Sequence, residues 1–142
     1  MKRVILDASV ATKLFLSVPG SDLAWRAARQ FHFVAPALVL AETANALWKY
    51  VKRGDTTAED ATGAVTHLAE ITEIHDKPML VERALSLACK LSHPVYDCTY
   101  LALAEAEKLA LLSADKRLLA LAQEHIWPDV ISLNSLTSDN AS

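Results

Sequence analysis

The chain has 142 residues, 52% of them hydrophobic and 22% charged, which predicts one globular domain with a sizeable core rather than a disordered chain. Its 14 basic and 17 acidic residues give a net charge of −3, which counts against a module that grips nucleic acid through a broad basic surface. No apolar run approaches the ~20 residues of a membrane span, and Asp7 interrupts the first apolar segment, so we expect a cytoplasmic protein without an export signal or membrane partner.

The first apolar run, Val4 to Leu6, leads directly into Asp7, and Ser9 follows two residues later. A continuous apolar run is typical of a strand buried on both faces of a parallel sheet. Such a strand ends at the carboxyl edge of the sheet, where open α/β folds place their sites. An aspartate in this position is about as often a helix N-cap as a functional acid, so both interpretations stay open.

Alternating helices and strands are predicted for the next segment. A short helix over 10–16 carries Lys13. Pro19 and Gly20 then form a turn, and Ser21 is the expected N-cap of the following helix. A second strand over 32–35 ends at Pro36, which also suits the first position of a helix over 37–53.

The helix predicted over 37–53 ends at Gly54 and has two distinct faces. Its apolar stripe consists of Leu40, Ala44, Leu47 and Val51. Its polar face consists of Glu42, Asn45, Lys49 and Lys52. A solvated surface explains such a face about as well as a site does, and the early position of Glu42, between apolar residues, favours the site slightly.

A capping box from Thr56 to Glu59 predicts another helix, which ends before a third strand over 71–74. The next predicted helix runs from Pro78 to Leu91, where His93 and Pro94 end it. Asp97 then lies in the first turn of an Ala/Leu-rich helix, where the helix dipole favours an acid whether or not it has a function.

The strand predicted over 109–113 repeats the arrangement around Asp7, because Ser113 and Asp115 follow its apolar residues. A helix from Lys116, then Pro128 and a strand over 130–133, complete the pattern. The fold class is therefore α/β, a three-layer α/β/α sandwich with a mainly parallel central sheet. We expect one domain over 1–133 and a polar, frayed tail over 134–142.

Several kinds of chemistry are excluded by what the sequence lacks. Three scattered glycines form no phosphate-binding loop, the five histidines form no zinc pattern, and no serine has a nucleophile-elbow context. Cys89 and Cys98 form no CxxC motif, so both are expected to be reduced thiols in the core. Four acids remain, each close to a predicted strand end or helix start: Asp7, Glu42, Asp97 and Asp115.

The segments around these acids resemble the ordered motifs of the PIN-domain family. The similar segments are Val4-Ile5-Leu6-Asp7-Ala8-Ser9, Pro36 through Glu42 to Asn45-Ala46-Leu47, Tyr96-Asp97-Cys98-Thr99 with its Ala/Leu-rich continuation, and Leu112-Ser113-Ala114-Asp115-Lys116-Arg117-Leu118. The resemblance is in particular to VapC-type toxin ribonucleases of toxin–antitoxin systems. Two small departures, Cys98 for the usual Ala and Ser113 for the frequent Thr, remove no carboxylate and no hydroxyl.

The resemblance implies a divalent-metal-dependent endoribonuclease that hydrolyses RNA phosphodiesters. Asp7, Glu42, Asp97 and Asp115 are then the catalytic and metal-binding acids, and the cofactor is Mg²⁺ or Mn²⁺. Repulsion agrees with this expectation, because two carboxylates ~4 Å apart repel by roughly 4 kcal/mol and need a proton or a cation. We expect three neighbouring side chains to hydrogen-bond to these acids: Ser9, Asn45 and Ser113.

The same resemblance implies a homodimer and a cognate antitoxin that covers the acidic site. Candidates for contacts with RNA phosphates are Lys13, Lys49, Lys52, Lys116 and Arg117, although an ordinary surface charge is at least as good an explanation for each. Two alternatives stay open: a PIN-like domain that binds RNA or protein without cleavage, and an aspartate-based metal-dependent phosphatase. The phosphatase is disfavoured because Ser9 stands where its second aspartate is needed.

Overall fold

The centre of the molecule is a sheet of five parallel strands in the order β3-β2-β1-β4-β5. The computed structural model describes residues 1–124 and 129–136. The strands are β1 (Lys2–Leu6), β2 (Phe31–Pro36), β3 (Thr72–His75), β4 (Leu111–Ser113) and β5 (Val130–Ser132). Each neighbouring pair is parallel, so the predicted parallel α/β architecture is confirmed and β1 is its central strand.

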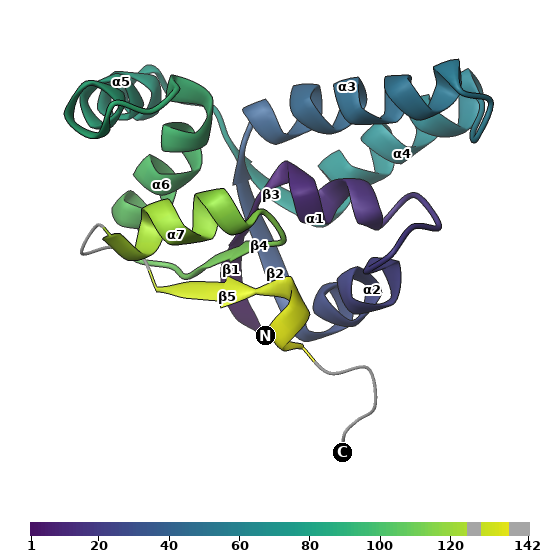
Figure 1. Cartoon of the computed structure of the whole chain (residues 1–142), viewed down its shortest axis with the longest axis horizontal. Helices are drawn as coiled ribbons and strands as arrows, with labels where there is room; N and C mark the ends of the chain where they lie inside the picture. Colours follow the sequence, from purple (N-terminus) through teal and green to yellow (C-terminus); the bar gives the residue numbers. More distant parts are fainter. Residues whose placement is uncertain (125–128, 137–142) are drawn as a thin grey trace.

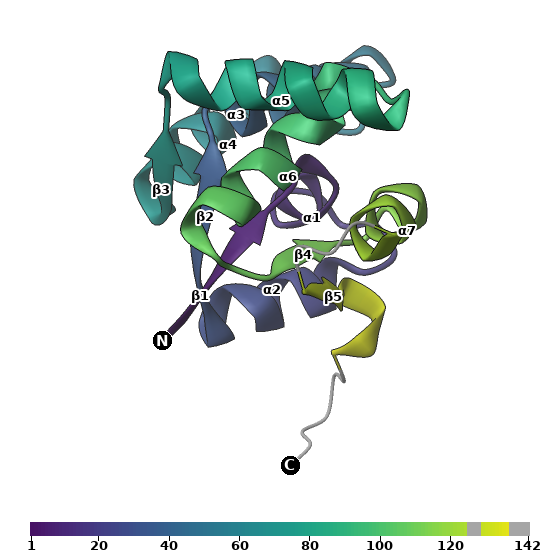
Figure 2. The same ribbon diagram turned by 90° about the vertical axis from the view of Figure 1, so that its left-hand side faces the viewer.

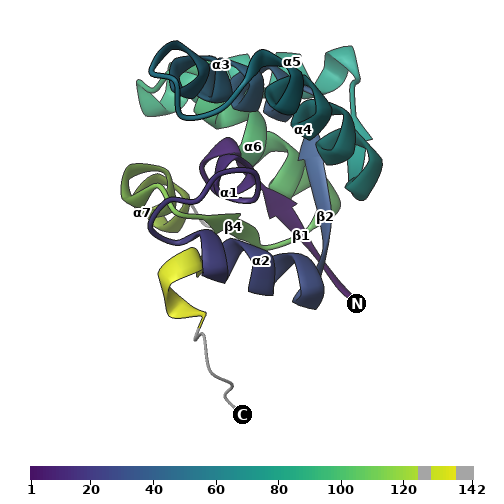
Figure 3. The same ribbon diagram turned by 90° about the vertical axis from the view of Figure 1, so that its right-hand side faces the viewer.

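Helices cover both faces of this sheet. They are α1 (Ala8–Lys13), α2 (Ser21–Gln30), α3 (Leu38–Lys52), α4 (Ala58–Ile71), α5 (Pro78–Leu91), α6 (Val95–Glu107) and α7 (Lys116–Glu124), with a short 3₁₀ helix over Leu133–Ser135 (Figure 1). Helix α6 lies in front of the strands from one side, with α5 packed against it at the top of the view (Figure 2), and α1 and α2 lie in front of the sheet from the opposite side (Figure 3). The three predicted layers are thus present. Among the described residues, no helix combines the length and apolar character needed to cross a membrane.

The chain order reverses between β1 and β4, and this reversal positions the site. From β1 the chain adds β2 and β3 on one side, then returns to add β4 and β5 on the other. Leu6 of β1 pairs with Leu112 of β4, so the carboxyl ends of these two strands lie side by side. In open α/β sheets, ligands bind in the crevice outside the strands at such a reversal. Asp7 and Asp115 both follow strands that end there.

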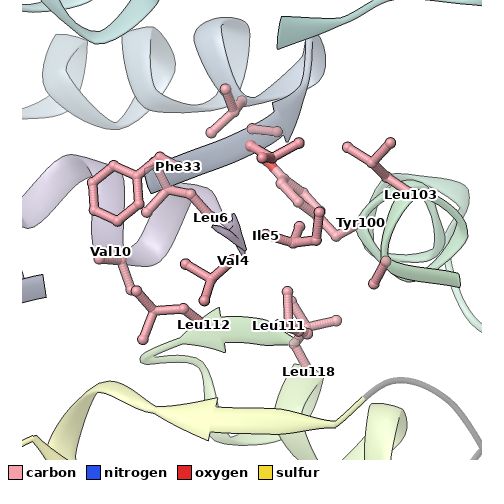
Figure 4. Packing of buried hydrophobic residues seen from close by; sticks show 14 of the residues in the cluster. Val4, Ile5, Leu6, Val10, Phe33, Tyr100, Leu103, Leu111, Leu112 and Leu118 are labelled. Carbon is pink, nitrogen blue, oxygen red and sulfur yellow. The ribbon is translucent and has the colours of Figure 1, made fainter. Parts of the chain in front are cut away.

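The strands that carry these acids are anchored in the hydrophobic core. Val4, Ile5 and Leu6 are 0% exposed, as are Leu111 and Leu112. Figure 4 shows Tyr100 and Leu103 of α6 beside β1, with Leu111, Leu112 and Leu118 on the β4 side. Burial of each large apolar side chain contributes about 1.5–3 kcal/mol. A well-packed scaffold therefore holds the sheet edge on which the acids lie.

Three predicted helix starts were wrong. Gly20, with a positive φ of 94°, is the N-cap of α2, while the Ser21 hydroxyl donates to the Leu16 carbonyl oxygen instead. Thr57 rather than Thr56 caps α4, accepting the Asp60 N–H at 3.0 Å. Pro36 is the last residue of β2 and not the first of α3. Neighbouring residues of similar type make such shifts of one position hard to read from sequence.

Other differences concern burial and element ends. The buried residues of α3 are Val39, Thr43 and Leu47, so of the predicted stripe only Leu47 is fully buried. The third strand begins at Thr72, because α4 continues through Ile71. Both cysteines are free thiols, but only Cys98 is buried and Cys89 is exposed, which corrects half of the core-thiol prediction.

The predicted C-terminal elements are covered only in part. Pro128 and residues 137–142 of the predicted tail lie outside the described residues. Leu133 is buried, and Asn134 and Ser135 continue from it in the 3₁₀ helix, so the first residues of that segment are structured rather than frayed.

Candidate active site

All four acids selected from the sequence line one pocket of about 550 Å³ at the carboxyl edge of the sheet. Asp7 follows β1, Glu42 lies on α3, Asp97 lies on α6, and Asp115 lies between β4 and α7. Four chain segments that are far apart in sequence thus converge, because parallel strands and the helices that follow them share one edge of the sheet.

Asp7 is the most deeply placed of these acids, with 4% of the residue exposed. Its Oδ1 accepts hydrogen bonds from the Ser9 hydroxyl at 2.7 Å and the Val10 N–H at 3.3 Å, and its Oδ2 accepts from the Ser113 hydroxyl at 2.6 Å. Burial raises the pKa of Asp7 to about 6 although these bonds oppose the rise, and the nearby charge of Asp115 raises it further. Asp7 therefore caps α1, which confirms the first interpretation, and it also presents a buried carboxylate to the pocket, so its role as a functional acid stays a prediction.

The two serines connect the ends of β1 and β4. The Ser9 hydroxyl accepts the Ala114 N–H at 3.0 Å, and the Ser113 hydroxyl accepts the Asp115 N–H at 2.9 Å. Asp115 Oδ1 in turn accepts the backbone N–H groups of Arg117 and Leu118 at the start of α7. This network fixes both aspartates relative to the sheet, and it is built from the hydroxyls that the sequence selected.

Asp97 lies beside a histidine and an arginine. Its Oδ2 lies 2.8 Å from Nε2 of His93, which precedes α6, and accepts a hydrogen bond of 3.4 Å from the Arg117 guanidinium. Arg117 was predicted as a contact for RNA phosphates, whereas His93 was assigned only the end of a helix. Because His93 precedes Pro94 and lies outside α6, the i, i+4 rule for pairs on one helix would not have linked it to Asp97.

Glu42 receives its hydrogen bond from a residue that the sequence analysis passed over. The Tyr100 hydroxyl donates to Glu42 Oε1 at 2.6 Å, across 58 residues of sequence. Partial burial raises the pKa of Glu42; the Tyr100 hydrogen bond lowers it, and the charge of Asp97 raises it. A tyrosine within the Ala/Leu-rich run of α6 is an unusual polar group in a buried segment, and that was the available signal.

The remaining predicted residues separate into two groups. Asn45 and Lys49 line the pocket together with Ser9. The other basic side chains predicted on α1 and α3 have different contacts: Lys13 donates to the Pro19 carbonyl oxygen, and the Lys52 ammonium lies over the Trp48 ring. Lys116 is exposed on α7 and is not among the residues that line the pocket.

A second group of ligand-type side chains lies outside this pocket. It consists of Glu73, His75 and Glu107, and within the described ranges it is the one group of three whose ligand atoms all lie within 4.8 Å of one another. The Arg3 guanidinium donates to Glu73 at 2.7 Å and to Glu107 at 3.4 Å. Hydrogen bonds from His75 and Arg3 hold the pKa of Glu73 below its ordinary value. Since Arg3 already compensates both carboxylates, the group behaves as an ion-pair network.

The donors around the pocket suit a hard divalent cation. All four candidate ligand side chains are carboxylates, and oxygen donors of this kind suit hard divalent cations. No three of the four acids bring their carboxylate oxygens within 4.8 Å of one another, so the four side chains do not form a closed set of direct ligands in this arrangement. Asp7 is the most buried of the four acids and has no cationic partner at hydrogen-bond distance among the described residues, so it is the acid that a cation would stabilise most.

Comparisons with known proteins identify the family. The PIN domain model matches residues 4–124. Ribonuclease VapC3 of Pyrobaculum aerophilum is 32% identical over 122 residues, which cover 82% of this chain and 92% of that protein. The crystal structure of PAE2754 from Pyrobaculum aerophilum matches with a TM-score of 0.71 at 22% identity, covering 94% of this chain and 91% of the other. A toxin–antitoxin complex from Klebsiella pneumoniae contains a chain that matches with a TM-score of 0.67 at 18% identity. The match covers 92% of this chain and 97% of that one. The match over residues 4–124 spans all four acids, and the chain belongs to the PIN-domain family.

Proposed function

We propose that this protein is a divalent-metal-dependent endoribonuclease that hydrolyses RNA phosphodiesters. The observation that carries the proposal is the convergence of Asp7, Glu42, Asp97 and Asp115 on one pocket at the reversal point of the sheet. The ribonuclease VapC3, which aligns with most of the chain, supports RNA as the substrate class.

Each acid would hold the cation or a water bound to it, and Mg²⁺ or Mn²⁺ would supply a water of lowered pKa and stabilise the charge that develops on phosphate oxygens. The protein's part is to fix the carboxylates. Ser9 and Ser113 orient Asp7, and the start of α7 orients Asp115. The raised pKa of Asp7, about 6, means that its carboxylate is charged only above that pH. Cation binding should therefore strengthen as the pH rises through 6.

Basic side chains at the rim would hold the RNA backbone. Lys49 lines the pocket on α3, and the Arg117 guanidinium lies 3.4 Å from Oδ2 of Asp97, which also lines the pocket. A pocket of about 550 Å³ accommodates a phosphodiester with its hydrated cation rather than a long stretch of RNA. With a net charge of −3, the protein would rely on these few cations and on the bound metal to offset phosphate repulsion.

The central test is cleavage of a generic single-stranded RNA with Mg²⁺, with Mn²⁺ and with chelator. We expect cleavage only with metal, and loss of cleavage in Asp7→Asn, Glu42→Gln and Asp97→Asn proteins. Asp22→Asn is the matched control, because Asp22 is an exposed aspartate in the first turn of α2. Full activity of purified Asp7→Asn protein would overturn the assignment.

The same assay separates the alternatives. A non-catalytic RNA-binding domain would retard RNA in a gel without cleaving it at any metal concentration. A phosphatase would release phosphate from p-nitrophenyl phosphate, but Ser9 is hydrogen-bonded to Asp7 and provides no second carboxylate for that reaction.

We further propose that the protein acts in the cytoplasm as the toxin of a toxin–antitoxin pair and forms a homodimer. The structural match to a chain of a toxin–antitoxin complex supports an antitoxin partner. Met79, Val81 and Leu85 on α5 are exposed apolar residues that a second copy would cover. Light scattering at micromolar concentration should give twice the chain mass for wild type and a monomer for Leu85→Asp; a monomeric wild type would contradict the dimer.

A further inference from the structure

We propose that Tyr100 is a positioning residue that holds the Glu42 carboxylate in place for a divalent cation. This inference rests on the proposed function. It assigns to a core tyrosine the task of fixing one wall of the acid pocket through a hydrogen bond between α6 and α3.

Tyr100 is well placed for this role because its ring has little freedom to move. The residue is 1% exposed, and Figure 4 shows its ring among the core side chains, beside Ile5 and Leu103. Tyr100 nevertheless lines the acid pocket, and its hydroxyl reaches Glu42 there. A rigid ring that ends in a hydroxyl presents a hydrogen-bond donor at a fixed point. Helix α6 thus contributes Asp97 to the pocket and, three residues later on a neighbouring face, a donor for Glu42.

Glu42 depends on this hydrogen bond for its position more than each of the other acids depends on any one of its contacts. Asp7 accepts from three donors, Asp97 lies within 3.4 Å of His93 and Arg117, and Asp115 accepts from two backbone N–H groups. Within the described part of the chain, the one hydrogen bond to the Glu42 side chain comes from Tyr100. A glutamate has more rotatable bonds than an aspartate, so an unanchored Glu42 would lose more rotamer entropy on binding a cation.

The hydroxyl also favours the charged form of Glu42. A short bond of 2.6 Å to a carboxylate is charge-assisted and stabilises the anion that a cation requires. A carboxylate can only accept, so the Tyr100 hydroxyl is the donor in this bond. Tyr100 binds Oε1 of Glu42, and among the described residues no protein group donates a hydrogen bond to Oε2, so that oxygen remains available to a cation.

The test is the affinity for Mn²⁺ of the RNA-free protein, measured by calorimetry or by the loss of the free-ion electron paramagnetic resonance signal. Tyr100→Phe keeps the ring and removes only the hydroxyl. We expect its dissociation constant for Mn²⁺ to rise about tenfold, which corresponds to about 1.4 kcal/mol. RNA cleavage should then need more Mn²⁺ for half-maximal rate but return close to the wild-type rate at saturating Mn²⁺, with the KM for RNA unchanged.

Two further variants show whether the effect passes through Glu42. In a Glu42→Gln background, Tyr100→Phe should leave the Mn²⁺ dissociation constant unchanged, because the group it positions is already altered. Tyr96→Phe is the matched control: Tyr96 lines the same pocket, is 64% exposed, and its hydroxyl makes no hydrogen bond to the four acids in the structure as described. It should bind Mn²⁺ like wild type.

A purely structural role for Tyr100 gives a different result. Tyr100→Phe would then melt at a lower temperature in chelator while binding Mn²⁺ with wild-type affinity, and that outcome overturns the proposal. Failure of the proposed function is separable, since a wild-type protein that binds Mn²⁺ but cleaves no RNA would refute the nuclease and still leave the Tyr100 measurement decisive.

Discussion

Neutralising the buried carboxylate of Asp7 should stabilise the metal-free protein at neutral pH. The pKa of Asp7 rises from 3.8 to about 6 on folding, chiefly because the side chain is desolvated. One pKa unit corresponds to about 1.36 kcal/mol, so ionised Asp7 costs the native state roughly 3 kcal/mol. Because the native state binds the proton more tightly, this cost is absent below pH 4, develops as the pH rises through 6, and is constant above that.

Asp7→Asn removes the titration while keeping the local hydrogen bonds. Asparagine caps helices about as well as aspartate, so the bond from the Val10 N–H to Oδ1 is preserved. The new amide can donate to the Ser113 hydroxyl, which has acceptor capacity and now donates to Asp7. The difference between the two proteins should therefore report the buried charge and not a lost cap.

Urea unfolding between pH 4 and pH 7.5 in chelator measures this difference. Wild type should lose roughly 3 kcal/mol of unfolding free energy relative to Asp7→Asn across this range. Asp22→Asn, at an exposed site, should follow the wild-type curve. At pH 7.5, Mn²⁺ should stabilise wild type by ~2.7 kcal/mol at a hundredfold excess over its dissociation constant, and should stabilise Asp7→Asn less. Parallel pH curves for wild type and Asp7→Asn would refute the reasoning.

Three other outcomes follow from the structure. Lys49→Ala should raise the KM for RNA several-fold and reduce its dependence on salt, whereas Lys52→Ala should change both little, because Lys52 lies over Trp48 and not in the pocket; steady-state cleavage at two salt concentrations compares them. Thr57→Ala should cost about 1 kcal/mol of unfolding free energy in urea unfolding, and Thr56→Ala much less. Equal losses in the two variants would contradict the assignment of Thr57 as the N-cap of α4. Leu112→Ala, at a fully buried position on β4, should cost about 2–5 kcal/mol, and a loss below 1 kcal/mol would contradict the packing of the central strands.

The sequence by itself determined the architecture and the position of the acids along it. The apolar run Val4 to Leu6 is buried on both faces of the sheet, and its consecutive apolar residues are enough to predict this from the sequence. Parallel strands end at one common edge, so a sequence that places Asp7 and Asp115 after two such strands also places them near each other. The family motifs carry the same information, which is why fold class and family were both predicted before the structure.

Only the tertiary structure decided which side chains meet across that edge. Tyr100 and Glu42 are 58 residues apart, and their contact depends on how α6 and α3 approach each other over the sheet. Lys49 and Lys52 fall on the same predicted face, yet Lys49 lines the pocket, whereas Lys52, the last residue of α3, lies over Trp48. Periodicity defines a helical face only to within about one residue, or 100° of rotation, and long-range packing removes that ambiguity.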